Sequence, residues 1–236
     1  MADRGARWGV AVVVATASAA LAGCGGSAPA PEEAGPAADR TTEAHRLVSD
    51  AYAGRPAVRL PAGFQVRRVT AEGFSLAFPR RWTALTQPDV AFPGVIRTLS
   101  RAHRSLTPSL LGLAAPDSPL KLLAFHGRAG RHFATTANVF VGPAPPGATF
   151  ERQGEGIVRA VRELRGLQGG VRVRRLTLPA GEALRLEYVR RGTATVQYVT
   201  VRGDRLYAVV YTTLPSLRSR YSRAFALSAR TLSIDD

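Results

Sequence analysis

The sequence predicts an α+β domain in which helices pack against an antiparallel β-sheet. Three observations carry this prediction. Strand-like segments joined by short turns, which make antiparallel neighbours, follow one another at 171–178, 183–189, 194–201 and 206–212. Amphipathic helix patterns flank this run at 149–166 and 216–231. Leu206 to Tyr211 is apolar at both parities, which is typical of a strand covered on both faces, so we expect helices on both sides of the sheet centre.

The two helices have distinct signatures. The first is expected to begin near Thr149 and to stop at Gly166, because glycine adopts the left-handed conformation that ends many helices. Its apolar stripe is Phe150, Ile157, Val161 and Leu164. In the last helix we expect inward positions at Leu217, Tyr221, Ala224, Ser228 and Leu232. Its mostly outward positions are Arg218, Arg220, Arg223 and Arg230.

Earlier elements are predicted from shorter patterns. Strands are expected at 64–69, 74–78, 121–126 and 136–141, the last two forming a hairpin around a turn at 127–131. Pro79 ends the second strand because it lacks an amide donor, and Trp82 is a candidate core residue. Between 83 and 120 we expect one short helix near 95–106 and irregular loops, because prolines interrupt anything longer.

The N-terminus has the layout of a cleaved export signal. Arg4 and Arg7 precede an apolar run from Trp8 to Ala20, which is shorter than the roughly 20 apolar residues that a membrane-spanning helix needs. The following tetrad, Leu21 to Cys24, resembles the lipobox of bacterial lipoproteins. The resemblance implies cleavage between Gly23 and Cys24 and lipidation of Cys24. The alternative is a soluble secreted protein with an incidental cysteine.

These signals divide the chain. We expect a lipoprotein signal peptide at 1–23, a lipidated cysteine and flexible tether at 24–40, a leader helix and linker at 41–59, and an α+β domain at 60–236. The acyl chains would hold the protein on the outer face of the cytoplasmic membrane. Cys24 is the only cysteine, so the domain has no disulfide, thiolate metal site or cysteine nucleophile.

The charge is strongly basic, with 32 Lys and Arg residues against 17 Asp and Glu and a net charge of +15. Every basic residue except Lys121 is arginine, a bias typical of a high-GC genome such as an actinobacterial one. Excess positive charge favours anionic partners. Candidate contacts are Arg218, Arg220, Arg223 and Arg230 on one helix and Arg172 and Arg174 on one strand. They would meet anionic lipids or wall polymers, or form a solvated basic surface. Nucleic acid is disfavoured because the export signal places the chain outside the cytoplasm.

The segment from Gly73 to Trp82 resembles the entry motif of PsbP-like domains, a glycine-phenylalanine strand that ends in proline and is followed by tryptophan. The order of later segments agrees, with Ala137 to Val139 in a middle strand and Arg205 to Tyr211 before a final helix. With the lipobox, the chain over about 60–236 resembles the LpqN and LpqT group of actinobacterial lipoproteins. The resemblance implies an α/β/α sandwich, no known catalytic residues, and a supporting or binding role in the cell envelope. We expect the domain to bind an envelope component or to assist a membrane protein complex.

No motif for catalysis, a cofactor or a metal is evident. His126 and His132 could meet across a hairpin, but two ligands are too few for zinc, and His45 and His103 are expected to be solvated. Arg202-Gly203-Asp204 is expected to form a turn. Two alternatives stay open. One is a hydrolase of envelope lipid or cell-wall esters with a serine such as Ser105, Ser109 or Ser118, and the other is a carrier with a lipid cavity between sheet and helices.

Overall fold

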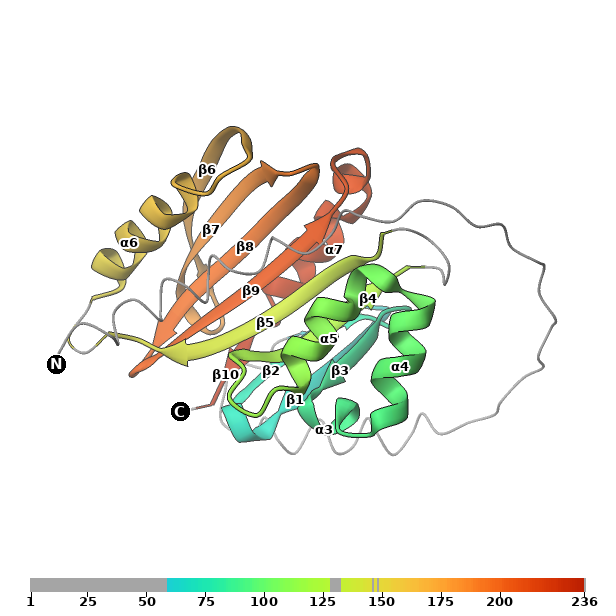
Figure 1. The fold of residues 1–236 in the computed structure, drawn as a ribbon. Coiled ribbons are helices and arrows are strands. Elements are labelled where there is room, and N and C mark those ends of the chain that lie inside the picture. Colours follow the sequence, from blue (N-terminus) through green and yellow to red (C-terminus); the bar gives the residue numbers. More distant parts are fainter. Residues whose placement is uncertain (1–58, 128–132, 146, 148, 236) are drawn as a thin grey trace, which may run out of the picture. The chain divides into compact units, whose positions relative to one another are not determined.

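The strands form two antiparallel sheets (Figure 1). The structure is a computed structural model and describes residues 59–127, 133–145, 147 and 149–235. The larger sheet has seven strands. Their spatial order is β3 (Thr83–Thr86), β4 (Leu120–His126), β5 (Thr135–Pro143), β9 (Arg205–Thr213), β8 (Thr193–Arg202), β7 (Gly181–Arg190) and β6 (Leu167–Leu178). The predicted α+β class, an antiparallel sheet flanked by helices, is confirmed.

The smaller sheet has three strands in the order β1 (Phe64–Val69), β2 (Phe74–Pro79) and β10 (Ser233–Ile234). We predicted a single sheet, and this detail was wrong. The backbone amide of Trp82 bonds back to the carbonyl of Pro79 at 2.8 Å, so the chain turns sharply after β2 and β3 starts in the other sheet. The two-residue strand β10 pairs with β2 at Ser75 and Phe74, and it is too short to be detected as a pattern.

One face of the large sheet packs against the small sheet and α7 (Arg218–Ala229). Phe74, Leu76 and Phe78 of β2 belong to the same buried cluster as Tyr211 of β9 and Phe225 of α7. Helix α7 contacts β2, β8 and β9. The apolar alternation of β2 and the buried side of α7 therefore cover the centre of the sheet together.

The opposite face is covered by the remaining helices. Helix α5 (Thr107–Ala114) packs on β4, and α6 (Phe150–Arg162) packs on β6 and β7. In Figure 1, α6 lies next to β6 and β7, while α4 and α5 lie together near β3 and β4. Their buried residues, such as Leu110 and Ile157, share a second cluster with Val210 of β9. Both faces of β9 are thus covered, as its unbroken apolar sequence predicted.

The prediction of one short helix and irregular loops between 83 and 120 was wrong. This segment holds β3 and three α-helices, α3 (Gln87–Val90), α4 (Pro93–Ala102) and α5. Pro88, Pro93 and Pro108 each occupy the first or second position of one of these helices. Proline is favoured there because the first amides of a helix have no intrahelical partner. The prolines therefore start helices that we expected them to interrupt.

The other elements agree closely with prediction. The Thr149 hydroxyl caps α6 by accepting the amide of Arg152, although the helix ends at Arg162 and Gly166, with φ of +83°, leads directly into β6. Arg202 is the last residue of β8, and Gly203 and Asp204 form the β8–β9 turn. The predicted signal peptide, tether and leader helix lie outside the described residues, as do residues 128–132 of the predicted hairpin turn. Within the described residues, no helix has the length and apolar character needed to cross a membrane.

Candidate functional site

The arginines predicted on a strand and on a helix come together on one face of the large sheet. In the β6–β7 register Arg172 is opposite Glu187, and Arg174 is opposite Arg185. Directly opposed residues of antiparallel strands project from the same face. Arg185 is in turn opposite Tyr198 of β8, which belongs to the buried cluster under α7. Arg172, Arg174, Arg185 and Glu187 therefore lie on the α7 side of the sheet.

Glu187 is the carboxylate that these guanidinium groups share. Arg185 Nη2 lies 3.0 Å from Glu187 Oε1, and Arg218 of α7 donates to the other carboxylate oxygen. The Arg185 guanidinium also lies 5.8 Å from the ring centroid of Tyr198. Burial raises the pKa of Tyr198, the positive charge of Arg185 and more weakly that of Arg230 oppose this shift, and the negative charge of Glu187 adds to it. We call this surface the arginine face; it consists of Arg172, Arg174, Arg185 and Arg218 around Glu187, and of Arg230, whose charge acts on Tyr198.

Two predicted arginines do not join the arginine face. Arg220 lies on the other flank of α7, with its guanidinium 6.0 Å from the Tyr221 ring centroid, and its charge acts on His126. Arg223 is exposed. Because it stands two residues from buried Phe225, helical periodicity turns it away from the sheet. Sequence reasoning also missed Arg185, which alternates with apolar residues in β7 and gave no cluster signal.

His126 is half-buried and takes part in an aromatic cluster. Its Nδ1 lies 2.7 Å from the hydroxyl of Tyr221, and its ring stacks on Trp82 at 6.2 Å. Burial lowers the pKa of His126, and the charges of Arg220 and Arg81 lower it further. His132, which the sequence suggested as a second metal ligand beside His126, lies outside the described residues. The described part of the chain contains no group of three or more potential metal ligands.

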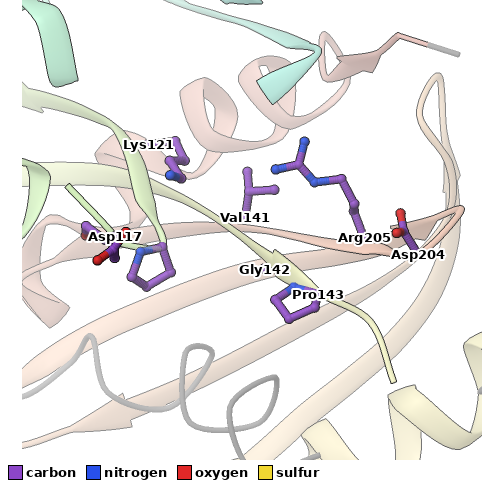
Figure 2. A pocket seen from close by; sticks show the side chains of 9 residues that line it. Asp117, Lys121, Val141, Gly142, Pro143, Asp204 and Arg205 are labelled. Atoms are coloured by element: carbon purple, nitrogen blue, oxygen red, sulfur yellow. The ribbon is translucent and has the colours of Figure 1, made fainter. Parts of the chain in front are cut away.

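A separate pocket of about 380 Å³ lies where β4, β5 and the β8–β9 turn meet (Figure 2). Lys121 and Arg205 line it, together with Asp117, Asp204 and the apolar side chain of Val141. Figure 2 shows Asp204 beside Arg205 and Asp117 toward the Lys121 end. Lys121 is the only lysine of the chain. Its departure from the arginine bias was the one sequence signal that could have found this pocket.

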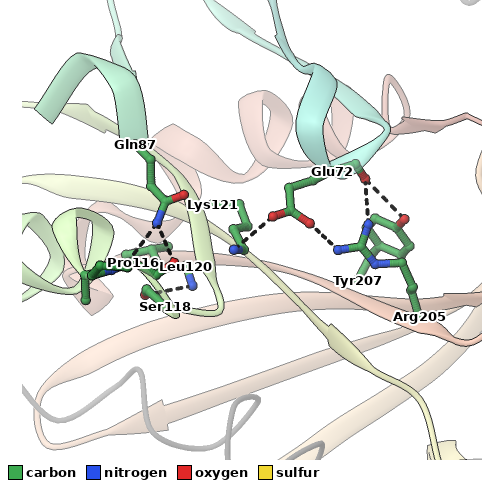
Figure 3. Close-up of polar contacts among 9 residues, drawn as sticks. Glu72, Gln87, Pro116, Ser118, Leu120, Lys121, Arg205 and Tyr207 are labelled. Atoms are coloured by element: carbon green, nitrogen blue, oxygen red, sulfur yellow. Dashed lines mark hydrogen bonds and ion pairs between the residues drawn. The ribbon is translucent and has the colours of Figure 1, made fainter. Parts of the chain in front are cut away.

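The two cations of this pocket are held by Glu72 (Figure 3). Lys121 Nζ lies 2.8 Å from Glu72 Oε1, and Arg205 donates to Oε2 of the same carboxylate. The side chains of Lys121 and Glu72 are only 15% and 13% exposed. Burial by itself would raise the pKa of Glu72, but hydrogen bonds and charge from Lys121 and Arg205 outweigh it and hold that pKa below its ordinary value. The network ties the turn before β2 to β4 and β9.

Replacing Glu72 by glutamine is expected to lower the free energy of unfolding at pH 7 by about 1 kcal/mol, because it removes charge-assisted hydrogen bonds. The folded pKa is lower than the unfolded one, so this stabilisation exists above the ordinary value of 4.5 and disappears as the pH falls through the folded pKa. Urea unfolding of both proteins across this range is the measurement. A difference that persists unchanged at the acid end would contradict the assignment.

The remaining candidate residues are scattered. Ser118 is buried, and its hydroxyl accepts the amide of Leu120, while the buried hydroxyl of Ser105 has no partner in the described residues. Ser109 is half-buried on α5. His103 was expected to be solvated, and this was wrong: it is buried, with its ring 5.2 Å from that of Phe125. The turn between α4 and α5 places it over β4, and burial lowers its pKa.

Comparisons with known proteins add similarities of fold at low identity. Neither a family model nor a curated protein matches the chain. Among solved structures, cyanobacterial PsbP from Synechocystis sp. PCC 6803 is 13% identical and covers 73% of this chain and 93% of its own, with a TM-score of 0.45. LpqN of Mycobacterium tuberculosis, described as involved in cell envelope biogenesis, is 12% identical and covers 73% and 92%, with a TM-score of 0.48. A Pseudomonas aeruginosa protein of unknown function is 13% identical and covers 74% and 99%, with a TM-score of 0.38.

Proposed function

We propose that the chain is a non-catalytic lipoprotein, anchored through Cys24 on the outer face of the cytoplasmic membrane, with a binding or accessory role in the cell envelope. The cationic segment, the apolar run and the tetrad ending at Cys24 support the anchor. Two or more acyl chains hold a protein on a bilayer durably, whereas one chain binds reversibly. In this proposal the arginine face is the surface that contacts anionic groups of the envelope.

The observation that carries the proposal is the excess of guanidinium groups around one carboxylate. Arg185 and Arg218 share Glu187, while Arg172 and Arg174 extend the same face on β6 with exposed side chains. Arginine binds phosphate and carboxylate groups through paired donors, and each cation near an anionic surface contributes about 1 kcal/mol. Phosphate-bearing headgroups or wall polymers therefore suit this face.

Vesicle binding tests the proposal. The chain from residue 24, made without acyl groups, is expected to bind vesicles containing phosphatidylglycerol and not vesicles of phosphatidylcholine alone. The double variant Arg172→Gln/Arg174→Gln removes two cations and is expected to weaken this binding by about 30-fold. Sedimentation with vesicles at low and high salt measures both, and salt should weaken the wild type more than the variant.

The matched control is Arg97→Gln/Arg101→Gln, which removes the same charge from exposed positions on α4, on the opposite side of the large sheet. We expect it to bind nearly as well as the wild type. Equal losses in both double variants would mean that net charge, and not the arginine face, attracts the vesicles. The hydrolase alternative stays a prediction; a covalent serine-directed probe that labels Ser105, Ser109 or Ser118 would favour it.

A further inference from the structure

A second pocket, of about 550 Å³, lies between α6 and the edge formed by β6 and β7. Ligand pockets in proteins commonly measure about 300–1,000 Å³. It is on the side of the large sheet that α5 and α6 cover, whereas the arginine face is on the α7 side. The two surfaces are therefore separate, and nothing in the proposed function uses this pocket.

The inner wall of the pocket is apolar. Phe150 and Val158 line it from α6, and Val173 and Leu184 line it from the strands. Phe150, Val158 and Val173 are only partly buried, because α6 directs its fully buried residues to the sheet and leaves this flank beside the edge strand uncovered. A Cβ on Gly154 would lie 2.7 Å from Leu184 Cδ1, so the glycine lets α6 approach β7 closely at the base of the pocket.

The rim of the pocket is charged. It carries Arg159, Arg162 and Arg175 together with Glu155 and Glu163. Arg175 pairs loosely with Glu151, at 4.0 Å between side chains that are 63% and 51% exposed. Among the described residues, no ion pair within 4.0 Å involves Arg159 or Arg162.

Arg162 and Arg159 have different neighbours on α6. Arg159 has Glu155 and Glu163 four residues away on either side, where i and i+4 side chains meet. Arg162 instead has Val158, part of the apolar wall, four residues before it. Its guanidinium is therefore free to bind an anion directly beside an apolar surface, and its methylene stem can extend that surface.

We propose that this pocket binds a single-chain lipid with a phosphate head group, the acyl chain lying against Phe150, Val158, Val173 and Leu184 and the phosphate against Arg162. The apolar wall and the Arg162 guanidinium together determine this class of ligand. The apolar wall favours removal of an acyl chain from water, and the planar guanidinium fits the two-oxygen edge of a phosphate. The domain would then hold an envelope lipid on the surface facing away from the arginine face.

Titration calorimetry of the non-acylated chain with oleoyl-lysophosphatidylglycerol, below its micelle concentration, tests this directly. Val158→Trp fills the pocket and is expected to weaken binding by about tenfold or more, and Arg162→Gln by about tenfold through loss of a charge-assisted contact. Leu111→Trp, a comparable enlargement at a site that is 57% exposed on α5, should bind like the wild type. Val173→Trp fills the pocket from the strand side and replaces Val158→Trp if the latter does not fold.

The comparison ligands separate the outcomes. Oleoyl-lysophosphatidylcholine and oleate should bind at least about fivefold more weakly than the phosphatidylglycerol form. Oleate has no phosphate, and in the choline lipid the quaternary ammonium group offsets the phosphate charge that Arg162 would bind. Equal affinity for all three would overturn the phosphate assignment, and unchanged affinity in Val158→Trp or Val173→Trp would overturn the pocket. Arg172→Gln/Arg174→Gln should keep wild-type affinity here, so a failure of this inference is distinct from a failure of the vesicle experiment.

Discussion

Replacing Phe225 by alanine is expected to lower the free energy of unfolding by about 3–5 kcal/mol, the largest effect of any substitution proposed for this chain. Phe225 is 2% exposed and stands where α7 meets the sheets. Its ring lies 4.7 Å from that of Tyr211, 5.9 Å from Tyr221 and 6.3 Å from Trp82. Its removal leaves a cavity bordered by rings that cannot close it without moving α7.

Urea unfolding followed by circular dichroism measures this loss. Leu111→Ala is the control, because Leu111 is 57% exposed and its truncation should change stability by no more than about 0.5 kcal/mol. Arg218 begins α7 and Arg230 follows its last residue, so loss of the Phe225 packing should shift both, and a variant that stays folded should also bind anionic vesicles more weakly. A loss below about 1 kcal/mol would mean that α7 is not anchored through this residue.

Replacing Gln197 by leucine is expected to raise the free energy of unfolding by about 1–3 kcal/mol, which is unusual for a single substitution. Gln197 is 0% exposed, and neither its amide nitrogen nor its oxygen has a hydrogen-bond partner in the described residues. On β8 it lies between Leu186 of β7 and Val210 of β9, both fully buried. An unpartnered amide in such a place costs its full desolvation penalty, and an isosteric apolar side chain does not.

Thr200→Val provides the matched control on the same strand. The Thr200 hydroxyl is equally buried but donates to the carbonyl of Glu182 at 2.7 Å, so its loss should destabilise the protein by about 1 kcal/mol. Opposite signs for the two variants are therefore expected in the same unfolding assay. Destabilisation by Gln197→Leu would show that the Gln197 amide has a partner in solution and would refute the assignment.

Sequence patterns predicted most of the fold because the relevant signals were local. The strands from β6 to β9 each show alternating or continuous apolar residues between short turns, and both long helices show apolar stripes. The prediction for residues 83–120 was wrong because proline has two opposite effects on helices. It breaks a helix in the interior, but it is favoured in the first turn. Pro93 and Pro108 both lie in the first turn of a helix. Strand β10 is too short for any periodicity.

Only part of the candidate site could be predicted from the sequence. Charge runs identified Arg172, Arg174 and Arg218, but their meeting on one face depends on strand register and on where α7 lies, neither of which is local. Arg185 and Glu187 alternate with apolar residues and look like ordinary solvated positions. The pocket beside α6 could not be predicted for the same reason, because its walls come from α6 and from two strands.

Lipidation of Cys24 would hold the chain on the outer face of the membrane. Intact mass and membrane fractionation of the protein from an actinobacterial host, beside a Cys24→Ala variant, test it most directly. We expect the wild type to begin at an acylated Cys24 and to fractionate with membranes, and the variant to be soluble or to retain its signal peptide. A wild type without acyl groups, fractionating like the variant, would contradict the anchor and favour a soluble secreted binder or enzyme.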